Sequence, residues 1–323
     1  MVRATILVTG ANGFIGAALC RSLLALPGRD VRGSLRGSHA NLPVGLQPVQ
    51  VATLDGSTDW QAALAGVDLV VHTAARVHVM HDSSSDPLAA FRQVNVGGTL
   101  NLARQAAMAG VKRFIFISSI KVNGEANPAG RPYQADDSPA PGDAYGVSKS
   151  EAEQGLWQLS AETAMEVVVI RPVLVYGPGV KANFHSMMRW LHKGVPLPLG
   201  AVDNRRSLVS VANLVDLIQV CMEHPRAANQ TFLVSDGNDV SLSQLLRMLG
   251  QALGRPARLL PVPSWLLRSA ASAIGRRNVA LRLFGSLQVD ISKNHQLLGW
   301  TPPYSLEQGL EVTAHAFLQA RSS

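Results

Sequence analysis

A tyrosine and a lysine near the middle of the chain carry side chains that can move protons. Tyr145 and Lys149 are four positions apart, a spacing that places them on one face of a helix. There the Lys149 ammonium would favour the phenolate and lower the pKa of Tyr145 from about 10. Such a tyrosine can exchange a proton with a substrate hydroxyl or carbonyl near neutral pH. Two serines lie upstream, Ser118 and Ser119, the second of them 26 positions before the tyrosine.

A glycine-rich turn near the N-terminus predicts where a dinucleotide would bind. Residues 9–16 read TGANGFIG; they follow an apolar run at 4–8 and open a helical stretch at 14–26. Gly10 and Gly13 would allow a tight turn and close approach of the backbone to a pyrophosphate. Gly16 would let the helix pack on the strand, with the anion at the helix N-terminus. An ordinary glycine turn is the alternative interpretation.

The composition is that of a globular protein. The 323 residues are 47% apolar and 16% charged, enough for two modest domains or one large domain with a substantial core. The two cysteines are far apart in the sequence, which argues against a disulfide framework and fits a reducing cytosol. We expect a cytoplasmic protein, because the first residues read as a strand and no apolar run approaches the ~20 residues of a membrane span.

The chain is basic, with a net charge of +7 and a pI of about 9.8. Its basic residues read as scattered and only 5% of the residues are aromatic, so an anionic small molecule is favoured as partner over nucleic acid. Residues 259–287 are apolar but interrupted by prolines and arginines. A packed amphipathic helix is the favoured interpretation of this stretch, and an interfacial helix is the alternative.

Strand and helix patterns alternate through the first half of the chain. Strands are predicted at 4–8, 31–35, 47–51, 68–72, 113–118 and 166–171, and helices at 14–26, 58–65, 87–109 and 144–163. This alternation predicts an α/β fold with a Rossmann-type doubly wound parallel sheet, whose ligands bind at the carboxyl ends of the strands. Further along, a strand at 231–234 and helices at 241–253, 264–274 and 305–319 are predicted.

Two domains are expected. Residues 1–176, with about 207–237, would form the NAD(P)-binding Rossmann domain, and about 177–206 with 238–323 a smaller mixed α/β substrate domain. The segment 124–143 is rich in proline, glycine and aspartate. Because it separates Ser119 from Tyr145, we interpret it as a loop over the site.

Taken together, the motifs resemble those of the extended short-chain dehydrogenase/reductases, the NAD-dependent epimerase/dehydratase family, and in particular its sugar-nucleotide 4-epimerase and 4-ketoreductase branch. The resemblance covers nearly the whole chain. It rests on TGANGFIG at 9–16, HTAA at 72–75, NVGGT at 95–99, SSIKVNG at 118–124, YGVSK at 145–149, RPVLVYGPG at 171–179 and RRSLVSVANLVD at 205–216.

The resemblance assigns roles to individual residues. It implies that Tyr145 is the general acid/base, that Ser119 hydrogen-bonds the reacting sugar oxygen, and that Lys149 holds the nicotinamide ribose. Substrate contacts are expected at Ser119, Asn183, Arg206 and Arg282, where the arginines would face the phosphates of a uridine nucleotide. The expected cofactor contacts are Gly10, Asn12, Gly13, Phe14, Ile15, Gly16, Arg36, Asp55, Gly56, Thr73, Ala74, Ala75, Asn95, Tyr145, Lys149, Pro172 and Val175.

Several of these residues also have plainer interpretations. Asn95 could cap a turn, Asn183 could be an ordinary loop residue, and Arg206 could be a solvated surface charge. No metal site is expected, because neither cysteine nor carboxylate completes a site around His72, His78 and His81.

Two departures from the family's patterns narrow the reaction. Dehydratases of the family carry an Asp-Glu pair directly after the active-site Ser/Thr, whereas this chain has Ile120-Lys121, which argues against dehydration. NAD-preferring relatives end the second strand with an acidic residue that accepts from the ribose hydroxyl. Leu35 holds that position here and Arg36 follows it, so NADP(H) is favoured over NAD(H).

The leading hypothesis from the sequence is an NADPH-dependent 4-keto reductase of a UDP-4-keto-6-deoxy-N-acetylhexosamine, of the quinovosamine or fucosamine type, for surface polysaccharide synthesis. The alternative is a UDP-glucose or UDP-N-acetylglucosamine 4-epimerase with tightly bound NAD, because the two share every catalytic residue. A non-catalytic NADP-binding regulator is a remote third possibility, since Tyr145 and Lys149 are both present. The resemblance also implies a homodimer.

Overall fold

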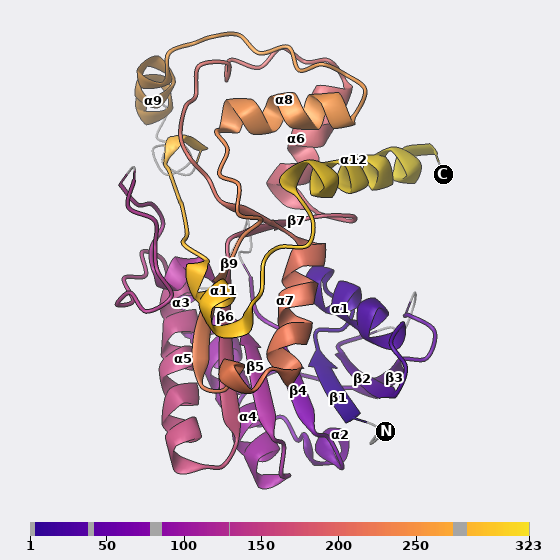
Figure 1. The fold of residues 1–323 in the computed structure, drawn as a ribbon. Helices are drawn as coiled ribbons and strands as arrows, with labels where there is room; N and C mark the ends of the chain where they lie inside the picture. The colour runs from indigo at the N-terminus through magenta and orange to yellow at the C-terminus, as the bar shows by residue number, and fades with distance from the viewer. Residues whose placement is uncertain (1–3, 38–41, 78–85, 129, 274–282, 323) are drawn as a thin grey trace.

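The computed structural model describes residues 4–37, 42–77, 86–128, 130–273 and 283–322. Its centre is a seven-stranded parallel sheet with the strand order β3-β2-β1-β4-β5-β6-β9 (Figure 1). The strands are β1 (Ala4–Thr9), β2 (Arg29–Leu35), β3 (Gln47–Gln50), β4 (Leu69–His72), β5 (Arg113–Ile117), β6 (Glu166–Pro172) and β9 (Gln230–Val234). The predicted Rossmann-type doubly wound sheet is confirmed. Its order reverses between β1 and β4, the point where such sheets bind ligands.

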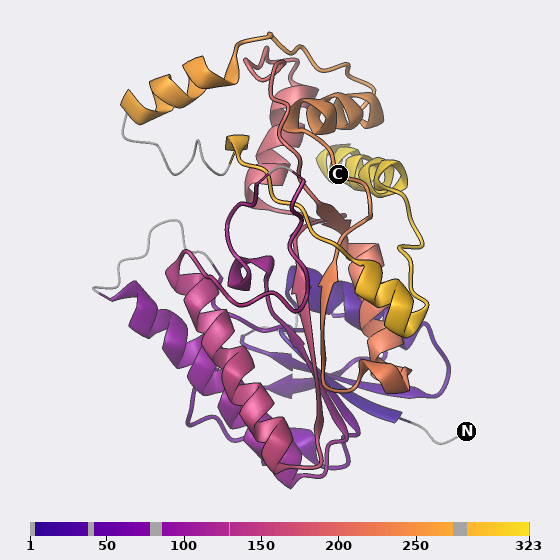
Figure 2. The same cartoon turned by 60° about the vertical axis from the view of Figure 1, so that its left-hand side comes forward.

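Both faces of the sheet are buried, which explains why its strands read as continuous apolar runs. Along β1, Ile6 and Val8 belong to one hydrophobic core and Leu7 to the other, as the two-residue period of a strand requires. The first core is covered by α1 (Phe14–Leu24), α7 (Val211–Glu223) and α11 (Ser292–Leu298), and the second by α2 (Gln61–Leu64), α4 (Thr99–Met108) and α5 (Ala144–Glu162). Figure 2 shows α4 and α5 on the opposite side of the sheet from α1 and α7.

The single helix predicted at 87–109 is in fact three segments. α3 (Pro87–Phe91) leads into a π-helical turn, Arg92–Gly98, and α4 follows. A β-carbon on Gly98 would lie 2.9 Å from the carbonyl oxygen of Leu54, so the loop before α2 packs directly on this turn. π-Helical turns are rare and concentrate at functional sites. This one carries Asn95.

Helices α6 (Ala182–His192), α7 and α11 were not expected from the sequence. The prolines and glycines around 178–200 concealed α6. α7 was missed although its sequence carried a usable signal, because its buried apolar residues recur at helical spacing: Val211, Leu214, Val215, Ile218, Cys221 and Met222. Its start is well defined, since the Ser210 side chain accepts a hydrogen bond from the Asn213 backbone N–H at 3.1 Å.

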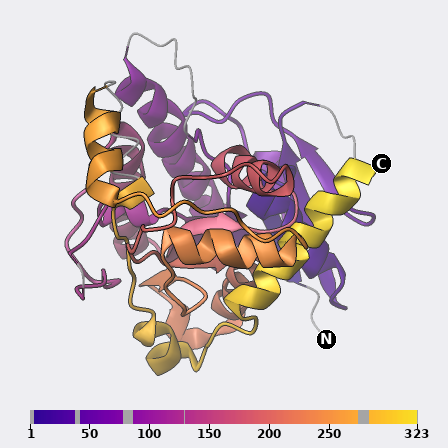
Figure 3. The same ribbon diagram turned by 90° about the horizontal axis from the view of Figure 1, so that it is seen from above.

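A third hydrophobic core lies beyond the carboxyl end of the sheet. It is built from α6, α8 (Leu242–Ala252) and α12 (Leu306–Ser322), with β7 (Leu174–Tyr176) and β8 (Leu208–Ser210) beside it. At its base the buried Tyr176 hydroxyl donates to Asp236 at 2.7 Å and its ring stacks on Phe184. Figure 3 shows α8, α12 and α9 (Ser264–Ala273) above the sheet; we call this part of the molecule the upper lobe. None of the described helices is long and apolar enough to cross a bilayer.

Gly16 offers a test of the packing between β1 and α1. A β-carbon there would lie 2.2 Å from the Gly10 carbonyl oxygen and 2.9 Å from the Thr73 hydroxyl. We expect Gly16→Ala to shift the glycine loop and lower the free energy of unfolding by about 1–3 kcal/mol, measured by urea denaturation. The control is Gly97→Ala, whose β-carbon would find its nearest neighbours at 3.7 Å. Equal unfolding midpoints for Gly16→Ala and wild type would contradict this account.

Candidate active site

Tyr145 lies in the first turn of α5, beside Ser119. The helix begins at its N-cap Asp143, whose carboxylate accepts from the Gly146 backbone N–H at 2.8 Å. Ser119 follows the carboxyl end of β5 and caps a short 3₁₀ turn, Ile120–Val122. Its side chain is hydrogen-bonded to the Tyr145 hydroxyl. The structure therefore brings together the two hydroxyl groups that the sequence placed 26 positions apart.

Lys149 lies one turn further along α5 and is buried at 2% exposure. Its ammonium nitrogen donates to the Ile117 carbonyl oxygen at 2.8 Å and sits 4.2 Å from the centroid of the Phe116 ring. Both partners belong to the end of β5, so the lysine fastens the helix to the central strand as well as completing the Tyr-Lys face. Burial lowers the pKa of Lys149 to about 7, although the nearby Glu153 carboxylate works in the opposite direction.

The pKa of Tyr145 differs in direction from the sequence-based expectation. Burial and the neighbouring Asp143 carboxylate raise this pKa to about 12, and the hydrogen bond from Ser119 offsets only part of the rise. Without a bound ligand, Lys149 does not lower the pKa of Tyr145 as expected, because its ammonium is directed at the Ile117 carbonyl and the Phe116 ring. The protein by itself keeps the tyrosine protonated at neutral pH.

A buried ion pair joins α5, the helix that carries Tyr145 and Lys149, to strand β6. Glu153 on α5 and Arg171 on β6 are 3% and 5% exposed, and their closest nitrogen and oxygen atoms are 2.5 Å apart. Glu153 also accepts from the Ser118 hydroxyl, and Arg171 donates to the Asn123 side chain at 3.0 Å. The pair therefore connects α5, β6 and both flanks of Ser119. Sequence reasoning missed Glu153, although its position four residues after Lys149 was a usable signal.

Asn95 is buried in the π-helical turn and takes no part in a simple cap. Its side-chain oxygen accepts from the Arg76 backbone N–H at 2.8 Å, and its nitrogen donates to the Arg76 carbonyl and to Ser148. Ser148 in turn donates to the Tyr145 carbonyl at 2.8 Å. Asn95 thus joins the segment after β4 to the first turn of α5. Its expected contact with a nicotinamide remains a prediction.

The glycine loop has the shape of an anion cradle. Gly10 has a φ of +65°, and a β-carbon there would lie 3.0 Å from Ala74, so the loop and the 73–75 segment are in direct contact. Thr73 donates to the Thr9 carbonyl at 2.6 Å. The N-cap of α1 is Gly13, which has no side chain to occupy the first backbone N–H groups. These features fit a dinucleotide pyrophosphate at the start of α1.

The other expected contacts in the loop also lie near this cradle. Asn12 is exposed, and Phe14 and Ile15 are partly buried against the core below the sheet's carboxyl edge. Ala75 follows Ala74 and is partly buried. Pro172 ends β6, and Val175 lies in β7.

His72 is a structural residue in this arrangement. Its two ring nitrogens lie 2.7 Å from the Thr9 hydroxyl and 2.9 Å from the Thr99 hydroxyl. Complete burial lowers the pKa of His72 to about 3, so the ring is neutral and forms part of a chain of hydrogen bonds between β1, β4 and α4. His78 and His81 lie outside the described residues.

At the adenine end of the predicted cofactor site, Asp55 and Arg36 lie on loops. The Asp55 carboxylate accepts from the Ser57 hydroxyl at 2.7 Å and from the Ser57 backbone N–H at 2.9 Å, and these bonds hold its pKa below the usual range. Gly56 lies beside Gly97 of the π-helical turn. Arg36 is exposed after the end of β2, and Leu35 before it is buried at 1%.

Two of the predicted substrate residues, Asn183 and Arg206, lie in the upper lobe. Asn183 is exposed in the first turn of α6. Arg206 is half-buried and donates to the Gly285 carbonyl at 3.1 Å, and burial lowers its pKa. Arg282 lies outside the described residues. The loop at 124–143 is tied to the C-terminal region, since Asn127 donates to the Gln288 carbonyl at 2.7 Å.

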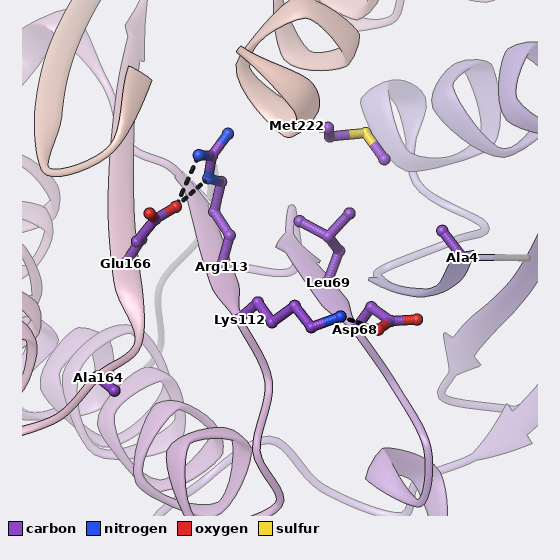
Figure 4. A pocket seen from close by; sticks show the side chains of 8 residues that line it. All are labelled: Ala4, Asp68, Leu69, Lys112, Arg113, Ala164, Glu166 and Met222. Atoms are coloured by element: carbon purple, nitrogen blue, oxygen red, sulfur yellow. Dashed lines mark hydrogen bonds and ion pairs between the residues drawn. The ribbon is translucent and has the colours of Figure 1, made fainter. Parts of the chain in front are cut away.

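An open pocket lies at the opposite edge of the sheet (Figure 4). It is formed where β1, β4, β5 and β6 begin, and Lys112–Asp68 and Arg113–Glu166 ion pairs cross it. Parallel sheets bind ligands at the carboxyl ends of their strands, so we place the active site at the other edge.

The buried Lys149 predicts a pH-dependent stability. The unfolded chain keeps this lysine protonated up to its ordinary pKa of 10.5, whereas the folded protein releases the proton near 7. The penalty for burying the charge is therefore complete below pH 7 and disappears by about pH 10.5. We expect Lys149→Met to be more stable than wild type by a few kcal/mol at pH 6.5, with the difference shrinking by pH 9.5, in urea unfolding curves. The exposed Lys193→Met is the control; a Lys149→Met difference independent of pH would contradict the burial of this charge.

Curated relatives align with almost the whole chain. A UDP-glucose 4-epimerase from Vibrio cholerae is 51% identical over 320 residues, covering 98% of this chain and 97% of the relative. A second relative, the N-acetyl-alpha-D-glucosaminyl-diphospho-ditrans,octacis-undecaprenol 4-epimerase of Escherichia coli O157:H7, is 28% identical over 334 residues and covers 98% and 96%.

This similarity corrects the leading hypothesis from the sequence. A 51% identity to a UDP-glucose 4-epimerase favours the epimerase alternative over the 4-keto reductase. The predicted catalytic residues could not separate the two, because the resemblance implies the same tyrosine, lysine and serine for both reactions.

Solved structures share the fold. The UDP-glucuronic acid 4-epimerase of Bacillus cereus in complex with NAD has a TM-score of 0.78 at 23% identity, covering 98% of this chain and 99% of the other. The UDP-glucose 4-epimerase of Thermotoga maritima with UDP-glucose gives 0.78 at 24% identity, covering 98% and 99%. At these identities the likeness establishes the architecture.

The family model for the NAD dependent epimerase/dehydratase family matches residues 6–235, from β1 to just beyond β9. This span holds the glycine loop, Ser119, Tyr145 and Lys149. The prediction of an NAD(P)-dependent enzyme of the extended short-chain dehydrogenase/reductase type is confirmed, and the chain belongs to the NAD dependent epimerase/dehydratase family.

Proposed function

We propose that this protein is a 4-epimerase of a UDP-hexose, with UDP-glucose as the first substrate to test. The observation that carries the proposal is the 51% identity to the UDP-glucose 4-epimerase of Vibrio cholerae over nearly the whole of both chains. The Ser119–Tyr145 hydrogen bond at the carboxyl edge of the sheet supports it, because a sugar C4 oxygen needs a proton acceptor and donor at one place.

In this proposal Tyr145 takes the proton of the C4 hydroxyl and later returns one to the C4 oxygen. Ser119 hydrogen-bonds the same oxygen and stabilises negative charge that develops on it. Bound NAD would supply the acceptor for the hydride on C4 and, once reduced, the donor that returns it. Lys149 holds the ribose beside the tyrosine. The positive charge of oxidised NAD, brought close to Tyr145, would lower the tyrosine pKa that the protein alone keeps near 12. Arg206 and Asn183 are proposed contacts to the uridine nucleotide.

We propose NAD as the cofactor in place of the NADP(H) favoured from the sequence. The Bacillus cereus neighbour was solved with NAD, and the glycine cradle between Gly10 and Gly16 serves either dinucleotide. Arg36 is an exposed residue after β2, so its charge alone does not require a 2′-phosphate. A cofactor that returns to its starting oxidation state in each turnover does not need the reduced NADP pool.

Other predictions from the sequence stay proposals. They are the two-domain division at about 177–206 and 238–323, the homodimer, and the individual cofactor and substrate contacts.

Tyr145→Phe tests the proposed chemistry. We expect the wild-type protein to interconvert UDP-glucose and UDP-galactose without net consumption of added NADH or NADPH, and Tyr145→Phe to be at least about 10²-fold slower, measured by separating the two sugar nucleotides. Tyr304→Phe is the matched control, since the Tyr304 ring is 49% exposed and lies in the segment before α12. Unchanged turnover in Tyr145→Phe, or stoichiometric oxidation of NADPH with a 4-keto sugar, would refute the proposal.

The cofactor proposal has its own test. We expect heat-denatured protein to release NAD, identified by mass spectrometry of the supernatant. Arg36→Ala should leave the amount of NAD unchanged, because the exposed guanidinium would contribute chiefly to binding a 2′-phosphate. Release of NADP by wild type, and its loss in Arg36→Ala, would favour NADP instead.

A further inference from the structure

The positive charge of this protein is concentrated in one part of the sequence. Between Asp239 and Asp290 there is no aspartate or glutamate, and the same stretch holds seven arginines: Arg247, Arg255, Arg258, Arg268, Arg276, Arg277 and Arg282. Residues 177–202 also lack an acidic residue and contain Lys181, Arg189 and Lys193. The basic residues are therefore less scattered than the sequence-based interpretation assumed.

The fold brings these two stretches together at the outer end of the upper lobe. Leu197 pairs with Leu259, and Ala201 with Pro263. The Leu197 backbone N–H donates to the Arg258 carbonyl at 2.9 Å, and the Leu260 N–H to the Leu197 carbonyl at 2.8 Å. Parts of the segments 193–202 and 253–263 thus run side by side, and the second leads into α9, which lies at one end of the upper lobe, away from the sheet (Figures 1 and 2).

Large apolar side chains are exposed along these paired segments and on the elements that flank them. Trp265 and Leu266 at the start of α9 are 67% and 47% exposed, while Leu267 packs against the core of the lobe and anchors the helix. Leu260 is 52% exposed, and Trp190 and Val195 beside the paired segments are 44% and 38% exposed. We call Trp190, Val195, Arg258, Leu260, Trp265 and Leu266 the outer-lobe surface. Among the described side chains of α9, Leu267 fits the packed amphipathic helix favoured from the sequence, whereas Trp265 and Leu266 are exposed.

Tryptophan and leucine side chains beside arginines, with no acidic residues among them, match the interface of an anionic lipid bilayer. There the indole rings lie at headgroup level, leucines reach the acyl boundary and guanidinium groups meet lipid phosphates. A nucleic acid would satisfy the arginines but leave Leu260, Leu266 and Val195 exposed. We propose that the outer-lobe surface docks this enzyme on anionic membranes, with α9 lying in the headgroup region. The proposal goes beyond the proposed epimerase activity and does not depend on it.

The proposed docking helix is separate from the elements that carry the predicted catalytic residues. Tyr145 lies at the start of α5 and Ser119 follows β5, whereas α9 belongs to the upper lobe (Figure 1). Attachment needs no membrane-spanning helix. A single short apolar helix with a basic surround gives reversible binding that depends on anionic lipid and weakens with salt.

Vesicle co-sedimentation of the full-length protein tests the proposal. We expect binding to phosphatidylcholine vesicles that contain phosphatidylglycerol, little binding to phosphatidylcholine alone, and weakening as salt rises. The double variant Trp265→Ala/Leu266→Ala should reduce the partition coefficient by about tenfold or more, because two interfacial anchors are lost. Arg258→Glu should reduce it several-fold by replacing attraction with repulsion.

Two matched variants serve as controls. Val312→Ala removes a side chain that is 57% exposed on α12, and Arg21→Glu reverses an exposed charge on α1; both should bind vesicles like wild type. All four variants should keep wild-type turnover of UDP-glucose and wild-type unfolding midpoints, which separates docking from folding and from the epimerase proposal. Equal binding to neutral and anionic vesicles, or wild-type binding by the double variant, would overturn the proposal. So would a double variant that changes only the oligomeric state, because the surface would then belong to a second copy of the chain.

Discussion

The buried ion pair between Glu153 and Arg171 holds the active site in its geometry. Glu153 belongs to the helix that carries Tyr145 and Lys149, and Arg171 belongs to the strand beside the serine strand. They also bond to Ser118 and Asn123, one on each side of Ser119, and Arg171 donates to the Ala135 carbonyl at 3.4 Å. Two buried charges cost several kcal/mol to desolvate, so such a pair adds little net stability compared with apolar side chains. Its contribution here is positional: it fixes how far along and around the strand edge the helix sits.

Other buried polar side chains at the carboxyl edge of the sheet are also held by hydrogen bonds. Lys149 is fastened to the Ile117 carbonyl, Asn95 to the backbone of Arg76, and His72 to two threonine hydroxyls. Each bond satisfies a group that burial would otherwise leave costly, and each joins two segments at this edge. Such bonds would hold a proposed sugar oxygen within reach of one tyrosine.

The parts of this arrangement that depend on residue spacing within one segment could be predicted from the sequence. The glycine loop, the sheet strands and the Tyr145–Lys149 face all follow from spacing within one segment. Features that arise from contacts between segments were missed. The role of Glu153 depends on its ion pair with Arg171, and the π-helical turn depends on the contact between Gly98 and the loop at Leu54. Helix α7 was missed although its buried residues, among them Leu214, Ile218 and Cys221, recur at helical spacing. The predicted lowering of the Tyr145 pKa was wrong for a related reason. Spacing on one face of a helix does not determine which acceptor the Lys149 ammonium will bind.

The error about the reaction is of another kind, because no side chain in the site encodes it. In the proposed reaction Tyr145, Ser119 and Lys149 would set where a proton moves, and burial in the protein alone holds the tyrosine pKa near 12 and the lysine pKa near 7. A reductase and an epimerase then differ in whether the oxidised and reduced cofactor is exchanged or retained between half-reactions, and in whether the keto sugar can turn over within the site. Leu35 and Arg36 do not distinguish these two reactions, whereas the 51% identity to a UDP-glucose 4-epimerase along nearly the whole chain favours the epimerase.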